Sequence, residues 1–312
     1  MEEVFRVEAA AEIDHFSYGW VTPALAYLSS FVGALVALLA TSRARPSDGA
    51  RRVGWLAVAA VALGCSSIWS MHFIAMLGFD VHGTAIRYDV GLTVLSLVLA
   101  VLVVGLGLAV VTAGRGRLWS LAVAGPVTGL GVAAMHYTGM SSIQMHGTVH
   151  HDRTFVVLSV VIAVVAATAA LWAALYVRGR PASVAAALVM GVAVCAMHYT
   201  AMAGTGVELV PDALLRSPPP GAAEADFVLP LLLGVGLPTI LLVQLLLVTD
   251  NERQIEQERT TRRRFDALRR AAEEPEGTEP RGAAAPAGPD MFSAAPAAPP
   301  DSGPAGPPRG RR

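Results

Sequence analysis

The sequence predicts an all-α membrane protein, a bundle of seven transmembrane helices built from three helix-pair repeats and one additional helix. Two observations predict this fold class. The chain of 312 residues is 54% hydrophobic and only 15% charged, whereas soluble domains carry about a quarter charged residues. The apolar residues also gather in runs of about 20 or more, the length that an α-helix needs to cross the hydrocarbon core of a bilayer.

Seven such runs follow one another along the chain, and most connections between them are short. Helices are expected because backbone that meets lipid must satisfy its hydrogen bonds within the segment. The runs cover approximately residues 20–41, 53–78, 90–113, 118–143, 154–177, 182–207 and 227–249. Together they predict one membrane domain over 20–249.

The arginines predict how this domain lies in the membrane, because cytoplasmic loops carry an excess of basic residues. All 23 basic residues are arginine. They gather after the first, third, fifth and seventh runs, as Arg43, Arg45, Arg51 and Arg52, then Arg115 and Arg117, then Arg178 and Arg180, then Arg253, Arg259, Arg262, Arg263 and Arg264. The sequence therefore predicts an outer N-terminus and a cytoplasmic C-terminus.

Three shorter segments flank the membrane domain. Residues 1–19 are acidic, have no basic region before the first apolar run, and predict an extracytoplasmic segment rather than a cleaved signal peptide. Residues 250–271 predict a charged juxtamembrane helix in the cytoplasm. Residues 272–312, rich in Pro and Ala, predict a disordered tail, and we expect no cytoplasmic globular domain.

A seven-residue motif occurs three times, once in each of the second, fourth and sixth runs. It reads SMHFIAM at 70–76, AMHYTGM at 134–140 and AMHYTAM at 196–202. Its histidines are 64 and 62 residues apart, so each interval contains two helices. The repeat unit is therefore a helix pair, and the orientation places all three histidines at similar depth near the outer face.

These residues predict a metal site. Ionisable residues within a membrane span are costly and usually functional, and each histidine shares a helix face with the methionine four residues later. Imidazole and thioether together favour copper, especially Cu(I). Ten residues after each histidine lies a further possible ligand at the outer surface. The predicted ligands are Met71, His72, Met76, Met135, His136, Met140, Met197, His198, Met202, His82, His146 and Glu208.

Other interpretations of the motif residues stay open. The histidines could serve only to hydrogen-bond helices together, and methionine is a common core filler. Tyr137 and Tyr199 could orient an imidazole or anchor the helix at the interface, a role that Phe73 could not share through a hydroxyl. A membrane copper carrier or transport protein is the main alternative function, and axial haem ligation by the histidines is another.

Several function classes are excluded or disfavoured. The chain has no lysine, which excludes a retinal Schiff base. No nucleophile motif or phosphate loop is present, so we predict that the chain is not an enzyme. The net charge of −1 gives no attraction to nucleic acid.

The sequences MHYT at 135–138 and 197–200 resemble the motif that names the MHYT domain family, and the resemblance extends over about 20–250. The resemblance implies a bacterial integral-membrane sensor module that binds copper near the outer face of the cell membrane and senses a diatomic gas or redox state. The first copy departs from the motif. The chain also departs from the family in that well-known members join the module to cytoplasmic output domains, whereas none is expected here. We therefore expect a stand-alone form, whose signal would pass to a separate cytoplasmic protein through 250–271.

Overall fold

The computed structural model describes residues 12–114, 117–210, 217–232, 236, 239–240, 243–244 and 257–269. They divide into two units, Met1–Glu256 and Gln257–Arg312. In the second unit, 257–269 form a helix whose side chains are all exposed. The predicted tail at 272–312 lies outside the described residues.

Among the described residues of the first unit, six helical spans are long and apolar enough to cross a membrane. They are α1 (Val21–Ala44), the span Gly49–Met76, α4 (Val90–Ala113), α5 (Leu118–Ser141), α6 (Arg153–Tyr176) and α7 (Arg180–Ala203). Each lies within four residues of a predicted run, which confirms the prediction of an α-helical membrane bundle. The seventh predicted run begins as α8 (Glu224–Leu231), and most of its remainder lies outside the described residues. The count of seven and the orientation stay predictions.

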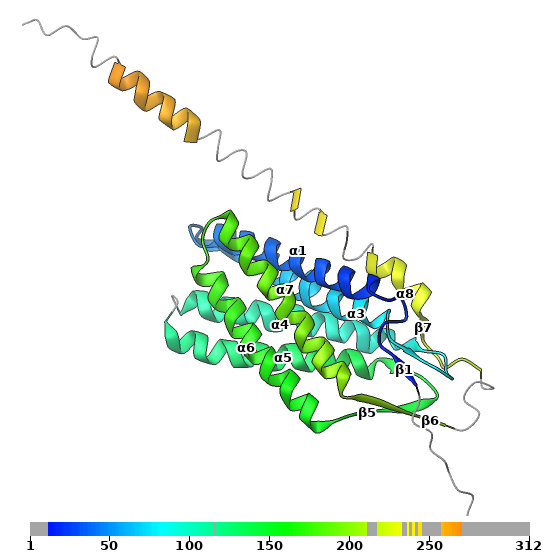
Figure 1. Ribbon diagram of the computed structural model, residues 1–312. Coiled ribbons are helices and arrows are strands. Elements are labelled where there is room, and N and C mark those ends of the chain that lie inside the picture. Colours follow the sequence, from blue (N-terminus) through cyan, green and yellow to red (C-terminus); the bar gives the residue numbers. More distant parts are fainter. Residues whose placement is uncertain are drawn as a thin grey trace, which may run out of the picture. The chain divides into compact units, whose positions relative to one another are not determined.

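The six spans form a closed ring. Each packs against its neighbour in sequence, and α7 closes the ring by packing against α1 (Figure 1). Large apolar side chains such as Leu106 and Val189 face outward, at 64% and 69% exposed, whereas small residues such as Ala100 and Ala187 are fully buried. Lipid-facing large residues and small residues at helix contacts are typical of membrane bundles.

The second span is irregular in its middle third. It consists of α2 (Gly49–Val61), the π-helical segment η1 (Ala62–Trp69) and α3 (Ser70–Met76). A π-helical segment adds a residue to the turn and occurs mostly at functional sites. Here it lies directly before the first copy of the motif, whereas the helices that carry the other two copies are α-helical throughout. The sequence does not predict it.

Short strands gather at one end of the bundle (Figure 1). They are β1 (Ile13–Asp14), β2 (Asp80–Val81), β3 (Arg87–Tyr88), β4 (Ile143–Gln144), β5 (Gly147–His151), β6 (Thr205–Leu209) and β7 (Ala222–Ala223). All pairings are antiparallel: β1 with β2, β3 with both β4 and β7, and β5 with β6. They tie the connections after α3, α5 and α7 together, so the motif-bearing ends of these helices are held at one level.

The opposite end carries the arginine-rich connections. Arg45 donates through Nη1 to the carbonyl of Val177, 2.8 Å away, at the end of α6. Arg52 donates through Nη2 to the carbonyl of Thr112, 3.0 Å away, in the last turn of α4. The last carbonyls of a helix lack partners within it and carry partial negative charge. These arginines therefore cap helix ends in addition to setting the charge of this face.

A close contact between η1 and α4 leads to a first prediction about the fold. A Cβ atom on Gly64 would lie 2.8 Å from Cα of Val101 and 2.9 Å from the carbonyl oxygen of Ala100, both backbone atoms of α4. Gly64→Ala must therefore push the helices apart, and we expect a loss of about 1–3 kcal/mol of stability, the usual cost of overpacking. Thermal unfolding in detergent measures it.

Gly54→Ala is the matched control, because nothing lies within 4 Å of the Cβ position on that residue of the same span. Alanine favours the helix over glycine, so this variant should unfold at the same temperature as the native chain or slightly higher. Equal melting temperatures for both variants would contradict close packing at η1.

Candidate metal centre

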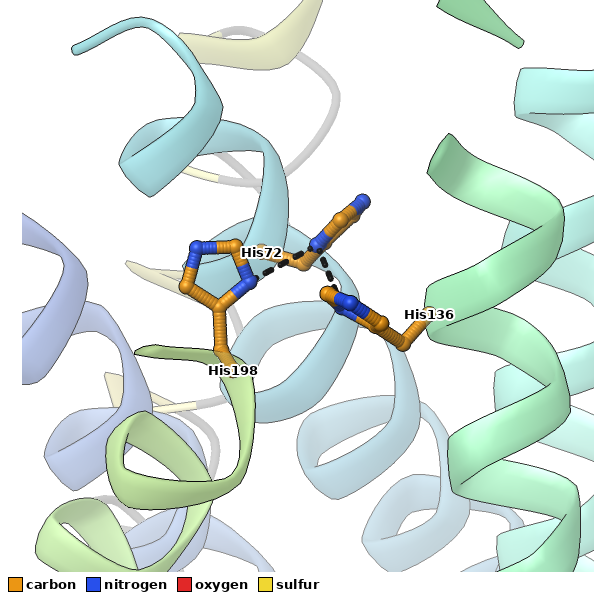
Figure 2. Close-up of side chains that lie close together, drawn as sticks. All are labelled: His72, His136 and His198. Carbon is orange, nitrogen blue, oxygen red and sulfur yellow. Dashed lines mark hydrogen bonds between the residues drawn. The ribbon is translucent and has the colours of Figure 1, made fainter. Parts of the chain in front are cut away.

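The three motif histidines meet inside the ring, near its strand-bearing end. His72 comes from α3, His136 from α5 and His198 from α7, four or five residues before those helices end. Each imidazole is 1% exposed. Figure 2 shows the three rings converging, with Nδ1 of His72 3.1 Å from Nδ1 of His198 and 3.2 Å from Nδ1 of His136. The predicted equal depth of the three copies is thus what brings these residues together.

Hydrogen bonding alone accounts poorly for this arrangement. The Nδ1 atom of a neutral imidazole carries either one proton or one lone pair, so His72 can serve one of its two Nδ1 contacts well, not both. The Nε2 atoms of His72 and His136 are buried and have no hydrogen-bond partner. Buried polar atoms without partners are costly. The crowding of three Nδ1 atoms around His72, which hydrogen bonding cannot satisfy, is what favours a component that accepts their lone pairs.

The spacing fits a shared metal ion. Imidazole nitrogens bind a metal at about 2.0–2.1 Å, so two that ligate one ion lie roughly 2.9–3.6 Å apart at angles between about 90° and 120°. The two contacts at His72 fall within this range. Potential ligand atoms of all three histidines lie within 4.8 Å of one another, and those of His136 and His198 would have to lie within about 4.2 Å to share one ion. Among the described residues, the cluster contains no carboxylate and no thiol.

The aromatic residue of each motif packs edge-on against its own histidine. Ring centroids are 4.7 Å apart for His72 and Phe73, with rings at 80°. The corresponding values are 4.9 Å and 83° for Tyr137, and 5.0 Å and 78° for Tyr199. The hydroxyl of Tyr137 bonds Ser159 of α6 at 2.9 Å rather than an imidazole. Of the two alternatives for Tyr137, a hydrogen bond to an imidazole therefore does not hold, and ring packing explains why phenylalanine serves in the first copy.

The six motif methionines are all buried, at most 3% exposed. Five lie in the main hydrophobic core, and Met71 packs in a smaller cluster with Ala26 and Ala75. They place polarizable side chains in the apolar surroundings of the histidines. Their ligation through sulfur stays a prediction.

The structure does not bring the predicted outer residues into the cluster. His82 is exposed after β2, and its backbone N–H donates to the carbonyl of Glu12. His146 lies between β4 and β5 and contacts the carbonyl of Ser217 through Nε2 at 2.8 Å. Glu208 is exposed in β6, opposite Thr148. These residues lie in the equivalent outer connections of the three repeats. Their common ten-residue spacing therefore follows from the repeated fold rather than from a shared ligand role.

One small residue of the motif shapes the site without being a candidate ligand. A Cβ atom on Gly139 would lie 2.5 Å from Nε2 and 3.0 Å from Cδ2 of His72. The equivalent positions in the other copies are Ala75 and Ala201. The glycine in the second copy therefore provides the space for the imidazole of the first.

His151, at the end of β5, covers the site from the strand side. Its ring centroid lies 5.4 Å from that of Tyr137, and its Nδ1 lies 3.3 Å from Oγ1 of Thr205. Burial and the neighbouring His150 hold the pKa of His151 below its usual value of 6.5. Its neutral form is therefore favoured in the folded protein.

This shift predicts how stability responds to acid. Below pH 6.5 the unfolded chain binds a proton at His151 before the folded chain does, so stability falls as the pH drops through this window. We expect the melting temperature to decrease from pH 7 to pH 5, and His151→Asn to make the decrease smaller. An identical slope in the native chain and in His151→Asn would refute the assignment.

Comparison with known proteins agrees with this architecture. The family described as "Bacterial signalling protein N terminal repeat", MHYT, matches residues 64–124 and 129–187. The bifunctional diguanylate cyclase/cyclic di-GMP phosphodiesterase MucR of Pseudomonas aeruginosa is 38% identical over 192 residues, 60% of this chain and 28% of that protein. The cyclic di-GMP phosphodiesterase NbdA of the same species is 35% identical over 186 residues, 58% and 23%.

An uncharacterized signaling protein of Caulobacter vibrioides is 36% identical over 181 residues, 57% of this chain and 21% of that protein. The chain thus spans about a quarter of the length of these relatives. No solved structure matches it. The apolar helices and the matched repeats together identify a multi-pass membrane protein of a signalling type that contains MHYT repeats at 64–124 and 129–187.

Proposed function

We propose that the chain is a membrane sensor that holds one copper ion with His72, His136 and His198, near the outer face of the bacterial cytoplasmic membrane. The observation that carries the proposal is the convergence of three buried Nδ1 atoms, one from each repeat, at 3.1 and 3.2 Å. Copper held there would supply one-electron redox chemistry and a position for a small ligand such as a diatomic gas. The three imidazoles would donate their Nδ1 lone pairs to the ion, and the edge-on aromatic rings fix the planes of the imidazoles.

The charge of the site supports copper over a divalent ion. The three ligands are neutral when they donate lone pairs, and no carboxylate joins them among the described residues. Burying an uncompensated charge is costly, and the cost grows with the charge. Monovalent Cu(I) therefore suits this site better than Zn²⁺. The six buried methionines make the surroundings favourable to a soft ion.

Two hydroxyl contacts made by η1 support communication with the cytoplasm. Directly before the motif of His72, Ser66 in η1 bonds Thr239 in the seventh predicted helix at 2.8 Å. Its neighbour Ser67 bonds Ser30 of α1 at 3.1 Å. Movement of His72 would be transmitted through η1 to the helix that leads toward 250–271. With the proposed cytoplasmic C-terminus, that segment would contact a separate output protein.

The alternative of a copper carrier has less support. Translocation needs successive sites across the membrane, and the described residues contain a single cluster of potential nitrogen, oxygen or thiolate ligands. Copper uptake into proteoliposomes separates the two functions: a sensor shows no uptake above protein-free vesicles.

Elemental analysis of the purified full-length protein, with absorption spectra in oxidised and reduced forms, tests the proposal. We expect about one copper per chain when three imidazoles from one chain hold the ion, no haem absorption, and loss of copper in the double variant His136→Ala, His198→Ala. Metal content that is unchanged by the double variant would overturn the proposed site, and a haem spectrum would replace it with a haem protein.

A further inference from the structure

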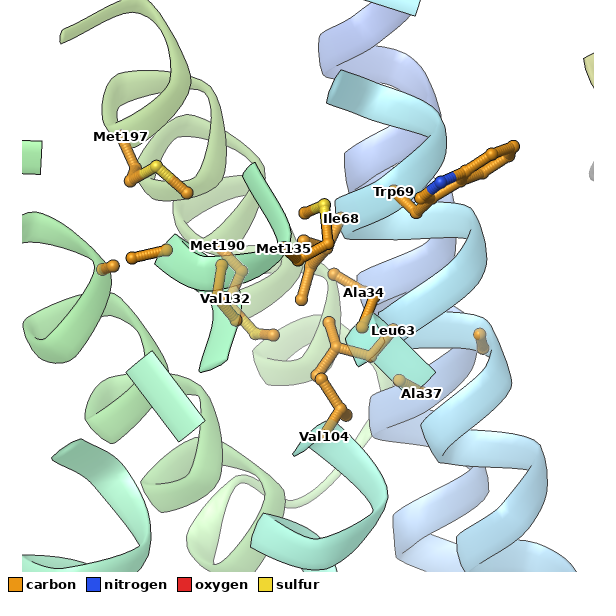
Figure 3. Close-up of a cluster of buried hydrophobic side chains, with 14 of the residues drawn as sticks. Ala34, Ala37, Leu63, Ile68, Trp69, Val104, Val132, Met135, Met190 and Met197 are labelled. Atoms are coloured by element: carbon orange, nitrogen blue, oxygen red, sulfur yellow. The ribbon is translucent and has the colours of Figure 1, made fainter. Parts of the chain in front are cut away.

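An apolar cavity of about 40 Å³ lies inside the ring, between η1, α4, α5, α6 and α7. Figure 3 shows several of its lining side chains, including Leu63 and Ile68 of η1, Val104 of α4 and Met190 of α7. Of the described residues that line the cavity, only Thr128 carries a polar side chain group. Thr128 is 4% exposed and its hydroxyl has no hydrogen-bond partner.

The repeat places this cavity directly beneath the three histidines. Ile68, Val132 and Val194 line it, and each lies four residues before the histidine of its own motif. Four residues are about one helical turn, roughly 5.4 Å, on the same helix face. The upper wall of the cavity is therefore formed by the turn that carries the imidazoles.

The lower wall depends on η1. Thr128 and Met190 lie eight residues before their histidines, whereas Leu63, which takes the equivalent place, lies nine residues before His72. The extra residue accommodated by the π-helical segment accounts for the difference. The segment thus allows all three repeats to line one cavity while keeping the three histidines at one level.

The size and lining define what can occupy the cavity. An apolar cavity of roughly 150 Å³ stays dry and holds benzene, which has six heavy atoms, so by volume this one holds about one or two. Water is disfavoured because it needs two to four polar partners, and the wall offers one hydroxyl. The space exists because α6 presents Ala163, Ala166, Ala167 and Ala170 to it.

We propose that this cavity is a binding site for an uncharged, weakly polar molecule of about two heavy atoms, a diatomic gas, held one turn below the metal centre. The proposal deepens the proposed function, because a ligand in the cavity lies next to the turn that carries the imidazoles. The cavity itself is built without the metal, so its occupancy can be measured independently of copper.

Xenon is the probe, measured by ¹²⁹Xe NMR on the full-length protein in detergent. We expect saturable binding by the native chain. Ala167→Val adds two carbon atoms to a wall residue, and we expect it to weaken xenon binding about ten-fold or more because the side chain fills the space. Ala169→Val, the same change two residues later at an exposed position of α6, should bind xenon as the native chain does.

The control separates the cavity from xenon dissolved in detergent, which all three proteins share. Ala170→Val fills the same wall from its neighbouring turn and replaces Ala167→Val if that variant does not fold. Absence of saturable binding to the native chain, or equal binding by the cavity and control variants, would overturn the proposal. If the purified chain carries no copper but still binds xenon in the cavity, the proposed copper site fails while the cavity proposal is supported, so the two failures are distinguishable.

Discussion

His72→Ala is expected to abolish copper binding, because His72 is the histidine whose Nδ1 contacts Nδ1 of both other proposed ligands. Its Nδ1 lies within 3.2 Å of Nδ1 of both partners, and the three ring centroids are 4.8, 5.1 and 5.2 Å apart. Loss of a residue that merely orients a ligand costs about 10–100-fold in metal affinity. Loss of this proposed ligand should cost more, and elemental analysis after purification should find little copper.

His82→Ala is the matched control for this experiment. It removes an imidazole from the same repeat, ten residues later, at an exposed position outside the cluster. The variant should retain native copper content. Loss of copper in His82→Ala, together with retention in His72→Ala, would move the site to the outer connections and contradict the arrangement of the three buried rings.

Gly139→Ala is expected to disturb the metal centre while leaving all three histidines in the chain. In an ordinary helix position the change would add stability, because alanine favours the helix by about 0.5–1 kcal/mol over glycine. Here the new methyl group would lie 2.5 Å from Nε2 of His72. The imidazole must turn away, so we expect reduced copper content and an altered copper spectrum.

Gly105→Ala provides the comparison, because its Cβ position lies 3.4 Å from Cβ of Ala60, an ordinary contact distance. This variant should keep native copper and native or higher thermal stability. If Gly139→Ala binds copper with the native spectrum, the imidazole of His72 is not held in the position described.

Much of this arrangement could be predicted from the sequence. Hydropathy locates six helices to within four residues, because span length is set by the thickness of the bilayer. The threefold repeat places His72, His136 and His198 at one depth, and a closed ring of helices can bring such residues together. The residue types therefore predict the centre before any coordinate is known.

Other features depend on details that hydropathy and spacing do not contain. Hydropathy cannot distinguish a π-helical from an α-helical hydrogen-bond pattern, so η1 was not predicted. Two-residue strands such as β2 and β7 form between connections far apart in sequence and have no pattern of their own. His82, His146 and Glu208 share the ten-residue spacing, but they lie in these connections and not among the buried rings.

X-ray absorption at the copper edge of the purified, full-length protein tests the central claim most directly. The account predicts about three nitrogen neighbours at roughly 2.0 Å, with the multiple scattering of imidazole, and loss of this signal in His72→Ala. Sulfur neighbours beside the nitrogens would add the predicted thioethers to the ligand set. A copper shell of sulfur alone, or protein that binds no copper in copper-replete cells, would contradict a centre built from the three repeated histidines.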